Sequence, residues 1–302
     1  MTSICLFGSW ARNTADQFSD KDVLIVGLTQ EECDSVAYKW RTSGWSVSCF
    51  TADHFLKMAS AGSLFVQHIK IEGKIVEDSG ILSAALDCFA PRSDYSRQLI
   101  DAFEPLSWIG STPRSYWSQL CIADILYVIC RNAAVVANAI SHQYIFEHTR
   151  LFEFLATEAK LTDEEYVSIA RLRSLKCAYR SRDSGVTIRD DVDRSVASAL
   201  KIAKHFGDLH ATGSRPSTWP NGYHELRRFE LSLLAKYDPR ELDTQIPGDQ
   251  YFEIWQLVCN PADYPKLRKF ASEQGELRLT QLSNESFQYK EALVSSLKRS
   301  EV

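Results

Sequence analysis

The stretch "LFGSWARNTADQFSDKDVLIV" at residues 6–26 decides the fold of the first part of the chain. An apolar run ends in Gly8 and Ser9. After ten further residues two acids, Asp20 and Asp22, stand one position apart before a second apolar run. Short continuous runs rich in β-branched residues are typical of buried strands. The stretch therefore predicts a strand, a glycine turn, a helix and a second strand that begins with two carboxylates.

Glycine allows a backbone to approach a ligand closely, so Gly8 suits a phosphate-binding turn. The free N–H groups of a following helix, together with the Ser9 hydroxyl, can hold a phosphate. Alternation along an extended strand places Asp20 and Asp22 on one face, roughly 7 Å apart, with Lys21 on the other. Two such carboxylates need a cation between them, and Mg²⁺ prefers oxygen ligands and bridges to phosphates. We therefore expect Mg²⁺ at the two aspartates.

In order and spacing, these residues resemble the signature of the DNA polymerase β-like nucleotidyltransferase superfamily, in particular its minimal and antibiotic-nucleotidylating branches. The resemblance covers about residues 1–90, and the matching positions are Gly8, Ser9, Ala11, Arg12, Ser19, Asp20 and Asp22. It implies that a nucleoside triphosphate binds with its β- and γ-phosphates at the glycine turn. It also implies that the aspartates hold Mg²⁺ while an acceptor hydroxyl attacks the α-phosphate and releases pyrophosphate.

Such enzymes usually carry a third acid on the neighbouring strand, where it takes the acceptor's proton. That strand is "WSVSCF" at residues 45–50, and the expected positions are Ser46 or Ser48. Candidates for a displaced acid are Asp53, Glu72, Glu77, Asp78 and, in the later helical part, Asp124. Three interpretations stay open: a displaced third acid, a two-acid enzyme, or a degenerate nucleotide-binding module of a regulatory or toxin–antitoxin type.

The order of elements predicts an α/β domain followed by an all-α domain. Residues 1–92 are expected to form a nucleotidyltransferase domain with a short mixed sheet, from strands at 3–9, 22–28, 45–50 and 74–78 and helices at 31–44 and 52–73. Residues 93–302 are expected to form a helical bundle, with helices at 114–140, 161–180, 189–206, 224–237, 249–259 and 284–299. Thr162 and Glu165 predict a capping box, and the Gly- and Pro-rich stretch 211–222 predicts a loop and a candidate subdivision near 210–222.

Polar residues on the longest apolar helix form a second group of candidates. Asp124, Arg131 and Asn138 are spaced by seven, which places them on one stripe. Charges in such a helix must be paired or face a cavity. They therefore form either an internal polar network or part of a ligand site in which Asp124 could act as the base.

Basic residues on a later helix form a third group. Arg173, Lys176 and Arg180 share one face and form either a solvated stripe or a site for the triphosphate, with Tyr179 beside them to stack on a base. In the first domain, Arg12 is expected either to touch phosphate or to pair with Asp20 or Asp22.

An RNase-like helical effector is a further alternative, because Arg131 followed by Asn132 resembles the catalytic arginine of the nucleotide-binding helical domains that accompany minimal nucleotidyltransferases. Those domains need a histidine shortly afterwards, whereas residues 136–138 are Val, Ala and Asn and His142 comes too late. The sequence therefore argues against this alternative.

The composition limits the class of protein and of partner. With 302 residues, 45% hydrophobic and 24% charged, the chain is expected to be a soluble globular protein, and its net charge of −5 disfavours binding of long nucleic acid. Eight cysteines without a CxxC pair, no leader-like segment and no charge-free apolar span predict a cytoplasmic protein without a membrane segment. The expected partners are a nucleoside triphosphate and an unidentified acceptor hydroxyl, and a homodimer is compatible with the sequence.

Overall fold

The computed structural model describes residues 2–110, 112, 114–188, 191–207, 223–235, 237–241, 244 and 258–261. The predicted loop 211–222 and the predicted helix 284–299 lie outside the described residues, as does most of the predicted helix 249–259. The chain divides into two compact units. Unit 1 is Met1–Leu99 with Asn132–Phe154, and unit 2 is Ile100–Arg131 with Leu155–Val302. Unit 1 therefore continues past the expected boundary at residue 92 and takes in part of the helical segment.

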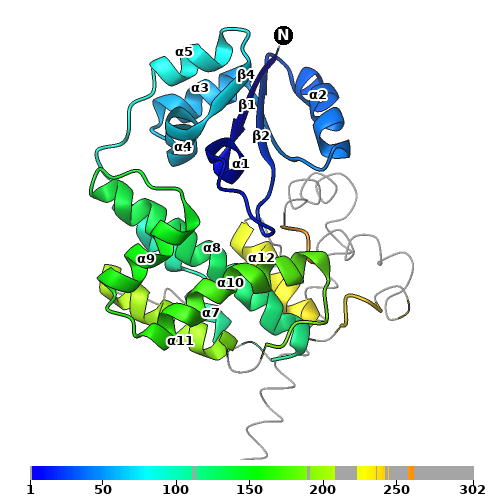
Figure 1. The fold of residues 1–302 in the computed structure, drawn as a ribbon, viewed down its shortest axis with the longest axis vertical. Coiled ribbons are helices and arrows are strands. Elements are labelled where there is room, and N and C mark those ends of the chain that lie inside the picture. The colour runs from blue at the N-terminus through cyan, green and yellow to red at the C-terminus, as the bar shows by residue number, and fades with distance from the viewer. Residues whose placement is uncertain are drawn as a thin grey trace, which may run out of the picture. The chain divides into compact units, whose positions relative to one another are not determined.

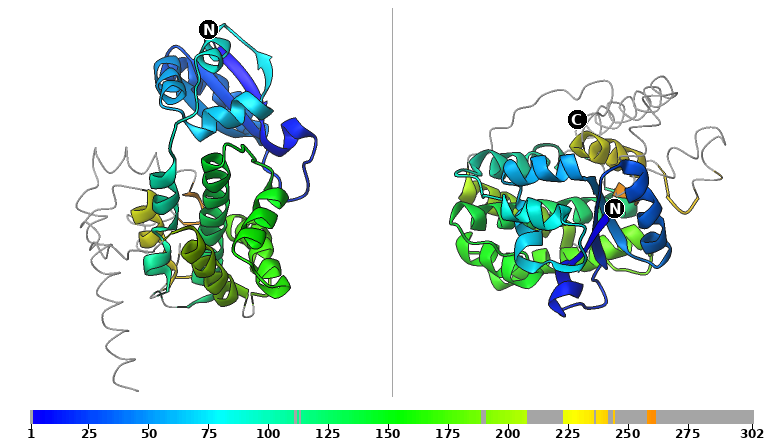
Figure 2. Two further views of the ribbon diagram at one scale, coloured as in Figure 1. Left: turned by 90° about the vertical axis from the view of Figure 1, so that its left-hand side faces the viewer. Right: turned by 90° about the horizontal axis from the view of Figure 1, so that it is seen from above.

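Unit 1 contains a four-stranded mixed sheet in the order β3-β2-β1-β4. Figure 1 labels β1, β2 and β4 of this sheet. The strands are β1 (Thr2–Phe7), β2 (Asp22–Gly27), β3 (Ser46–Thr51) and β4 (Lys74–Glu77). β1 is antiparallel to β2 and β4, whereas β2 and β3 are parallel and are joined by helix α2 (Gln30–Thr42). β4 forms one edge of the sheet (Figure 2). The predicted mixed sheet is confirmed.

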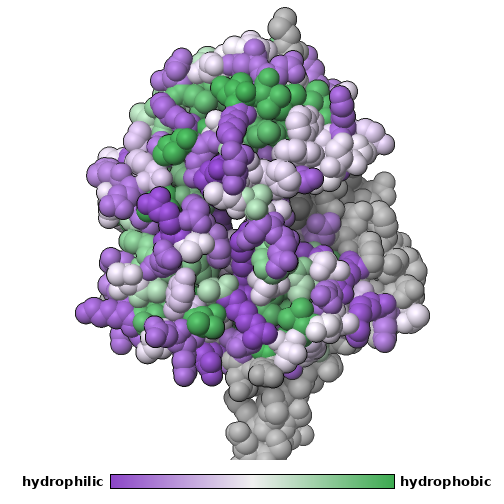
Figure 3. Space-filling model, viewed as in Figure 1, coloured by the Kyte–Doolittle hydropathy of each residue, from purple (hydrophilic) through white to green (hydrophobic). Residues whose placement is uncertain are grey.

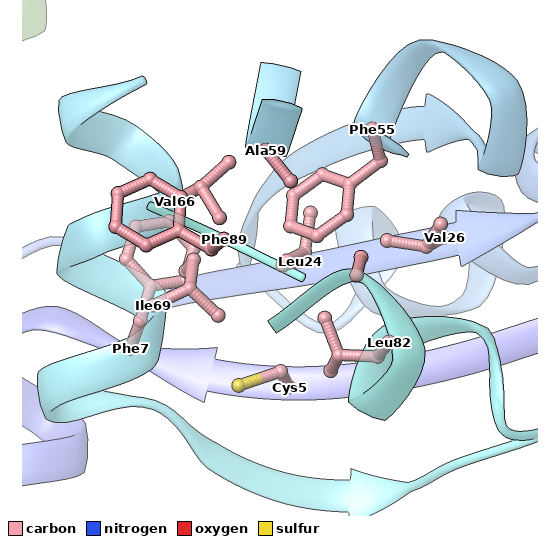
Figure 4. Packing of buried hydrophobic residues seen from close by; sticks show 11 residues of the cluster. Cys5, Phe7, Leu24, Val26, Phe55, Ala59, Val66, Ile69, Leu82 and Phe89 are labelled. Carbon is pink, nitrogen blue, oxygen red and sulfur yellow. The ribbon is translucent and has the colours of Figure 1, made fainter. Parts of the chain in front are cut away.

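Strand alternation divides the core of unit 1 between the two faces of the sheet. Leu24 and Val26 point into a cluster formed with α3 (Ala52–Ser60), α4 (Leu64–Glu72) and α5 (Ile81–Asp87) (Figure 4). Ile25 points the other way and packs with α2. Side chains on every second residue of a strand point to the same face of the sheet. Asp22, the first residue of β2, therefore lies on the same face as Leu24.

The predicted continuous helix 52–73 is wrong, because the structure contains two helices there. α3 ends at Ser60 and α4 begins at Leu64. Gly62 between them has a φ of +65°, and a Cβ there would lie 2.7 Å from the backbone nitrogen of Arg92. Ser63 then caps α4 by accepting a hydrogen bond from the amide of Phe65. Gly62 and Ser63 therefore form a helix break.

Four of the helices predicted within residues 93–302 are confirmed: α8 (Tyr116–Ile140), α10 (Asp163–Ser181), α11 (Asp191–Phe206) and α12 (Tyr223–Leu234). The capping box is also confirmed, since Thr162 accepts from the amide of Glu165, whose side chain accepts from the Thr162 amide. Among the described residues, four further helices were not predicted: α5, α6 (Ser96–Phe103), α7 (Leu106–Ile109) and α9 (His148–Glu158).

α8 is long and apolar enough to cross a membrane, but 83% of its most apolar window is buried inside the structure. That burial is typical of the core helix of a soluble protein. In agreement, hydrophilic and hydrophobic residues are interspersed over the face drawn in Figure 3. The helix is therefore weak evidence for a membrane span.

Candidate functional site

The predicted glycine turn and the second predicted aspartate lie together at one edge of the sheet. The Cα of Phe7, the last residue of β1, pairs with that of Asp22, the first residue of β2. Gly8 follows with a φ of +72°, and a Cβ at this position would lie 2.9 Å from Oδ2 of Asp22. Only glycine satisfies both the backbone conformation and the carboxylate beside it. The sequence motif is therefore also a spatial one.

The helix after the turn, which the sequence predicts in "WARNTADQF" at residues 10–18, is shorter than expected. α1 (Gly8–Arg12) spans five residues and ends at Asn13, which has a left-handed φ of 62°. A helix of five residues has few aligned peptide dipoles, so its macrodipole contributes little to anion binding at its N-terminus. An anion at this turn would therefore be held by backbone N–H groups and by the hydroxyl of the half-exposed Ser9.

The loop before β2 places Asp20 at the surface. Asp20 is exposed and precedes the strand, which begins at Asp22. Ser19 is part of a tight turn, because its hydroxyl donates to Oδ1 of Asp16 at 2.9 Å and accepts from the Asp16 amide at 3.0 Å. The Ser19 side chain therefore shapes the loop that leads to the two aspartates.

The neighbouring strand carries serines where a third acid was expected. In the parallel register of β2 and β3, Asp22 pairs with Ser46 and Leu24 with Ser48. Among the residues that the structure describes, no group of three or more His, Cys, Asp or Glu side chains is placed to hold a metal. Asp20 and Asp22 could still hold Mg²⁺ together with phosphate and water oxygens, because this ion normally keeps several such ligands.

The prediction that Asp53 reaches inward is wrong. It lies in the first turn of α3, beyond Thr51, whose partner on β2 is Gly27. Gly27 is five positions beyond Asp22 on β2, which is roughly 16 Å along the strand. The Asp53 carboxylate is exposed and pairs with Nζ of Lys57 at 2.7 Å. Asp53 is therefore a surface residue at the opposite end of the sheet.

Glu77 and Asp78 also belong to that opposite end. Glu77 pairs with Ile4, and Asp78 accepts a hydrogen bond from the Ser3 hydroxyl at 2.7 Å. Desolvation raises the pKa of Asp78, but hydrogen bonds from Ser83, from Ser3 and from backbone amides outweigh it and lower the pKa to about 2. Asp78 accepts hydrogen bonds from the amides of Leu82 and Ser83 in the first turn of α5. A carboxylate with so low a pKa binds a proton weakly and is therefore a poor base.

Glu72 lies nearer the glycine turn but is already paired. It accepts hydrogen bonds from Arg12 of α1 and interacts with Nε2 of His68 at 2.8 Å. Burial raises the pKa of Glu72, but the hydrogen bond and charge of His68 and the charge of Arg12 outweigh burial and lower it. His68 is itself buried against Phe146, with ring centroids 4.3 Å apart. Arg12 therefore pairs with Glu72 rather than with either aspartate, and the cluster fixes α1 on α4.

In unit 2, Asp124 belongs to a buried network of charges. Its two carboxylate oxygens accept from Nε of Arg180 at 2.8 Å and from Nη2 of Arg227 at 2.5 Å. Arg227 also pairs with Glu230 at 2.6 Å, and Asp124, Arg227 and Glu230 are all buried. The predicted internal network is confirmed for Asp124. Sequence reasoning missed Arg227 and Glu230, whose spacing of three on α12 could have indicated an ion pair.

The predicted basic stripe of α10 is half-buried rather than solvated. Arg180 binds Asp124, and Nζ of Lys176 lies 4.9 Å from the ring centroid of Tyr127 on α8. Arg173 is half-buried too. Tyr179 is fully buried and donates to Glu230, so the prediction that it stacks on a base is wrong.

The remaining residues of the predicted α8 stripe differ from Asp124. Arg131 is half-buried. The buried Asn138 donates from its side chain to the carbonyl of Ala134 in its own helix, at 2.8 Å. The three residues therefore do not form one network.

Sequence reasoning missed an aromatic group beside the glycine turn. Trp10 on α1 is 41% exposed, and Nζ of Lys21 lies 4.9 Å from its ring centroid. The Trp45 ring lies 6.3 Å from that of Trp10. The sequence did contain a signal for this aromatic group, because Trp10 directly follows Ser9 and Lys21 lies between the two aspartates.

No family model matches the chain, and no curated protein matches its sequence.

Proposed function

We propose that the chain is a Mg²⁺-dependent nucleotidyltransferase that moves a nucleoside monophosphate from a triphosphate to the hydroxyl of a small molecule, a protein or an RNA end. The observation that supports this proposal most is the close approach of Gly8 to Asp22. A Cβ atom at position 8 would lie 2.9 Å from the Asp22 carboxylate. A phosphate-binding turn and two carboxylates that hold Mg²⁺ are the parts that nucleotide transfer needs, and here Asp22 lies beside the turn while Asp20 lies in the loop just before β2.

Each part of the motif has a separate task in this proposal. The missing side chain of Gly8 leaves room for the Asp22 carboxylate beside the turn, and the backbone and hydroxyl of Ser9 contact the phosphate oxygens. Asp20 and Asp22 would hold Mg²⁺, which when bound neutralises the phosphate charge. A bond forms between the acceptor oxygen and the α-phosphorus, the bond to the bridging oxygen breaks, and pyrophosphate leaves. The Arg12–Glu72 pair keeps α1 in place.

A second candidate function is nucleotide binding without turnover, as in a regulatory or toxin–antitoxin-type module. The observation that favours it is the pairing of Asp22 with Ser46, which leaves β3 without a carboxylate to take the acceptor's proton. Glu72 is occupied by Arg12 and His68, and Asp53 lies at the other end of the sheet. Within this second function, the same residues bind the triphosphate and no pyrophosphate is released.

Pyrophosphate release separates the two functions. The purified chain is incubated with Mg²⁺, each of the four common ribonucleoside triphosphates, and a panel of small-molecule, protein and RNA acceptors. We expect Mg²⁺-dependent release that Asp22→Asn lowers at least a hundred-fold, about 3 kcal/mol of barrier, and that Asp53→Asn leaves unchanged. Binding that depends on Asp22 without any release supports the second function. Binding that is insensitive to Asp20→Asn and Asp22→Asn contradicts both.

A further inference from the structure

An exposed tryptophan lies next to the candidate phosphate turn. Trp10 directly follows Ser9 in α1, and 41% of it is exposed, although α1 packs on the rest of unit 1 through the buried Gly8 and Ala11. An indole left in water forgoes the gain from burying its apolar surface. The position of this ring beside the predicted site points to a ligand that covers it.

The ring is held by a rigid support. Trp45 lies 6.3 Å from Trp10, and Trp40 packs edge-on against Trp45 with centroids 5.0 Å apart. Trp40 in turn packs on the buried cluster of Ile25, Cys33 and Ala37. Trp45 directly precedes Ser46, the residue that pairs with Asp22. The aromatic group therefore extends from the core of unit 1 to the sheet edge that carries the predicted site.

A cation completes the group. Nζ of Lys21 lies 4.9 Å from the centroid of the Trp10 ring, and Lys21 stands between Asp20 and Asp22 in the chain. Lys21 lies over the face of the Trp10 ring. Indole stacks on a nucleobase and ammonium pairs with phosphate, so a nucleotide would engage both groups once Lys21 turns from the ring face toward the phosphate.

We propose that Trp10, Lys21 and Trp45 form a nucleobase-stacking subsite that deepens and rests on the proposed function. The base belongs either to the triphosphate or to the terminal nucleotide of an RNA acceptor. Both sources present the same flat ring and neighbouring phosphate. The net charge of −5 disfavours long nucleic acid but does not oppose a short single-stranded end.

Calorimetry of the full chain with three probes tests this subsite: ATP with Mg²⁺, inorganic tripolyphosphate with Mg²⁺, and a short single-stranded RNA with a free 3′-hydroxyl. We expect Trp10→Leu to weaken binding of ATP or of RNA about ten-fold, because stacking on one aromatic ring contributes that much or more. Tripolyphosphate has no base, so its affinity should not change. Trp10→Phe should restore most of the loss, and Tyr38→Leu, which removes another exposed aromatic side chain, should have no effect.

The pattern of losses identifies the source of the base. A loss for ATP alone assigns the base to the triphosphate, and a loss for RNA alone assigns it to the acceptor. Equal losses for ATP and tripolyphosphate, unchanged affinities, or a wild-type chain that binds neither ATP nor RNA would overturn the subsite. Asp22→Asn tests the proposed function separately, because it should weaken tripolyphosphate binding and leave the effect of Trp10→Leu on RNA intact.

Discussion

At the scale of single residues, the candidate site depends on Gly8. We expect Gly8→Ala to destabilise the chain by about 1–2 kcal/mol, because an L-residue is strained at a φ of +72°. The new methyl group would also displace the Asp22 carboxylate, so Mg²⁺-dependent binding of ATP should be lost. Chemical denaturation and calorimetry measure the two effects.

Gly80→Ala is the matched control for this change. Gly80 has a φ of +89°, but a Cβ there meets nothing within 4 Å. Its substitution should therefore cost a similar backbone strain and leave ATP binding intact. If Gly8→Ala binds ATP as tightly as the wild type, the proposed site at Gly8 and Asp22 is wrong.

Asp78 gives a prediction about pH at the same scale. Its pKa is about 2 in the folded chain and near the ordinary 3.8 when unfolded, so the ionised form favours folding. Its contribution is complete above about pH 3.8, falls as the pH falls and disappears below about 2. Asp78→Asn should lower the free energy of unfolding at pH 5, and the difference from wild type should shrink toward pH 2. A difference that is constant with pH would contradict this assignment.

At the scale of elements, hydrophobic period and local capping were enough to predict the four strands and the long helices. The break between α3 and α4 was not predicted, because the apolar period continues through it. Its cause is the close approach of Arg92, 30 positions beyond Gly62 in the chain, which no local pattern shows. In the same way, α1 was predicted too long, because Asn13 in a left-handed conformation ends it after five residues.

The capping box of α10 provides the prediction at this scale. Thr162→Ala removes the side chain that accepts from the Glu165 amide, and we expect a loss of about 1 kcal/mol in the free energy of unfolding. Glu164→Ala changes an exposed residue of the same turn outside the capping pair and should cost less. Denaturant titrations of both variants make the comparison, and equal losses would contradict the capping role.

At the scale of the whole chain, the division into units could not be predicted from the sequence. The hydrophobic periodicity of α8 continues without a break along the helix. The structure nevertheless assigns Asn132–Phe154 to unit 1 and the earlier part of α8 to unit 2. Phe146 shows why, because its ring stacks on His68 of α4. Long-range partners of this kind, like Glu72 for Arg12 and Arg227 for Asp124, follow from three-dimensional packing. By contrast, the sequence motif predicted the contact between Gly8 and Asp22, because both residues lie in the short connection between two neighbouring strands.

The buried network of unit 2 yields the last prediction. Asp124 is fully buried between Arg180 and Arg227, so Asp124→Ala removes the carboxylate that Arg180 pairs with and leaves Arg227 with Glu230 alone. Breaking a buried pair in this way costs about 3–5 kcal/mol. Asp193→Ala is the control, because Asp193 forms a largely exposed pair with Arg114 in the same unit and should cost less than about 1 kcal/mol.

Activity measurements then separate the two roles considered for Asp124. If the residue is structural, Asp124→Asn should lower the unfolding midpoint while the folded fraction releases pyrophosphate at the wild-type rate. If Asp124 were the base that replaces the missing third acid, the same variant would lose turnover by orders of magnitude at temperatures where it remains folded. Since both oxygens of Asp124 already accept hydrogen bonds from buried or half-buried arginines, we expect the first result.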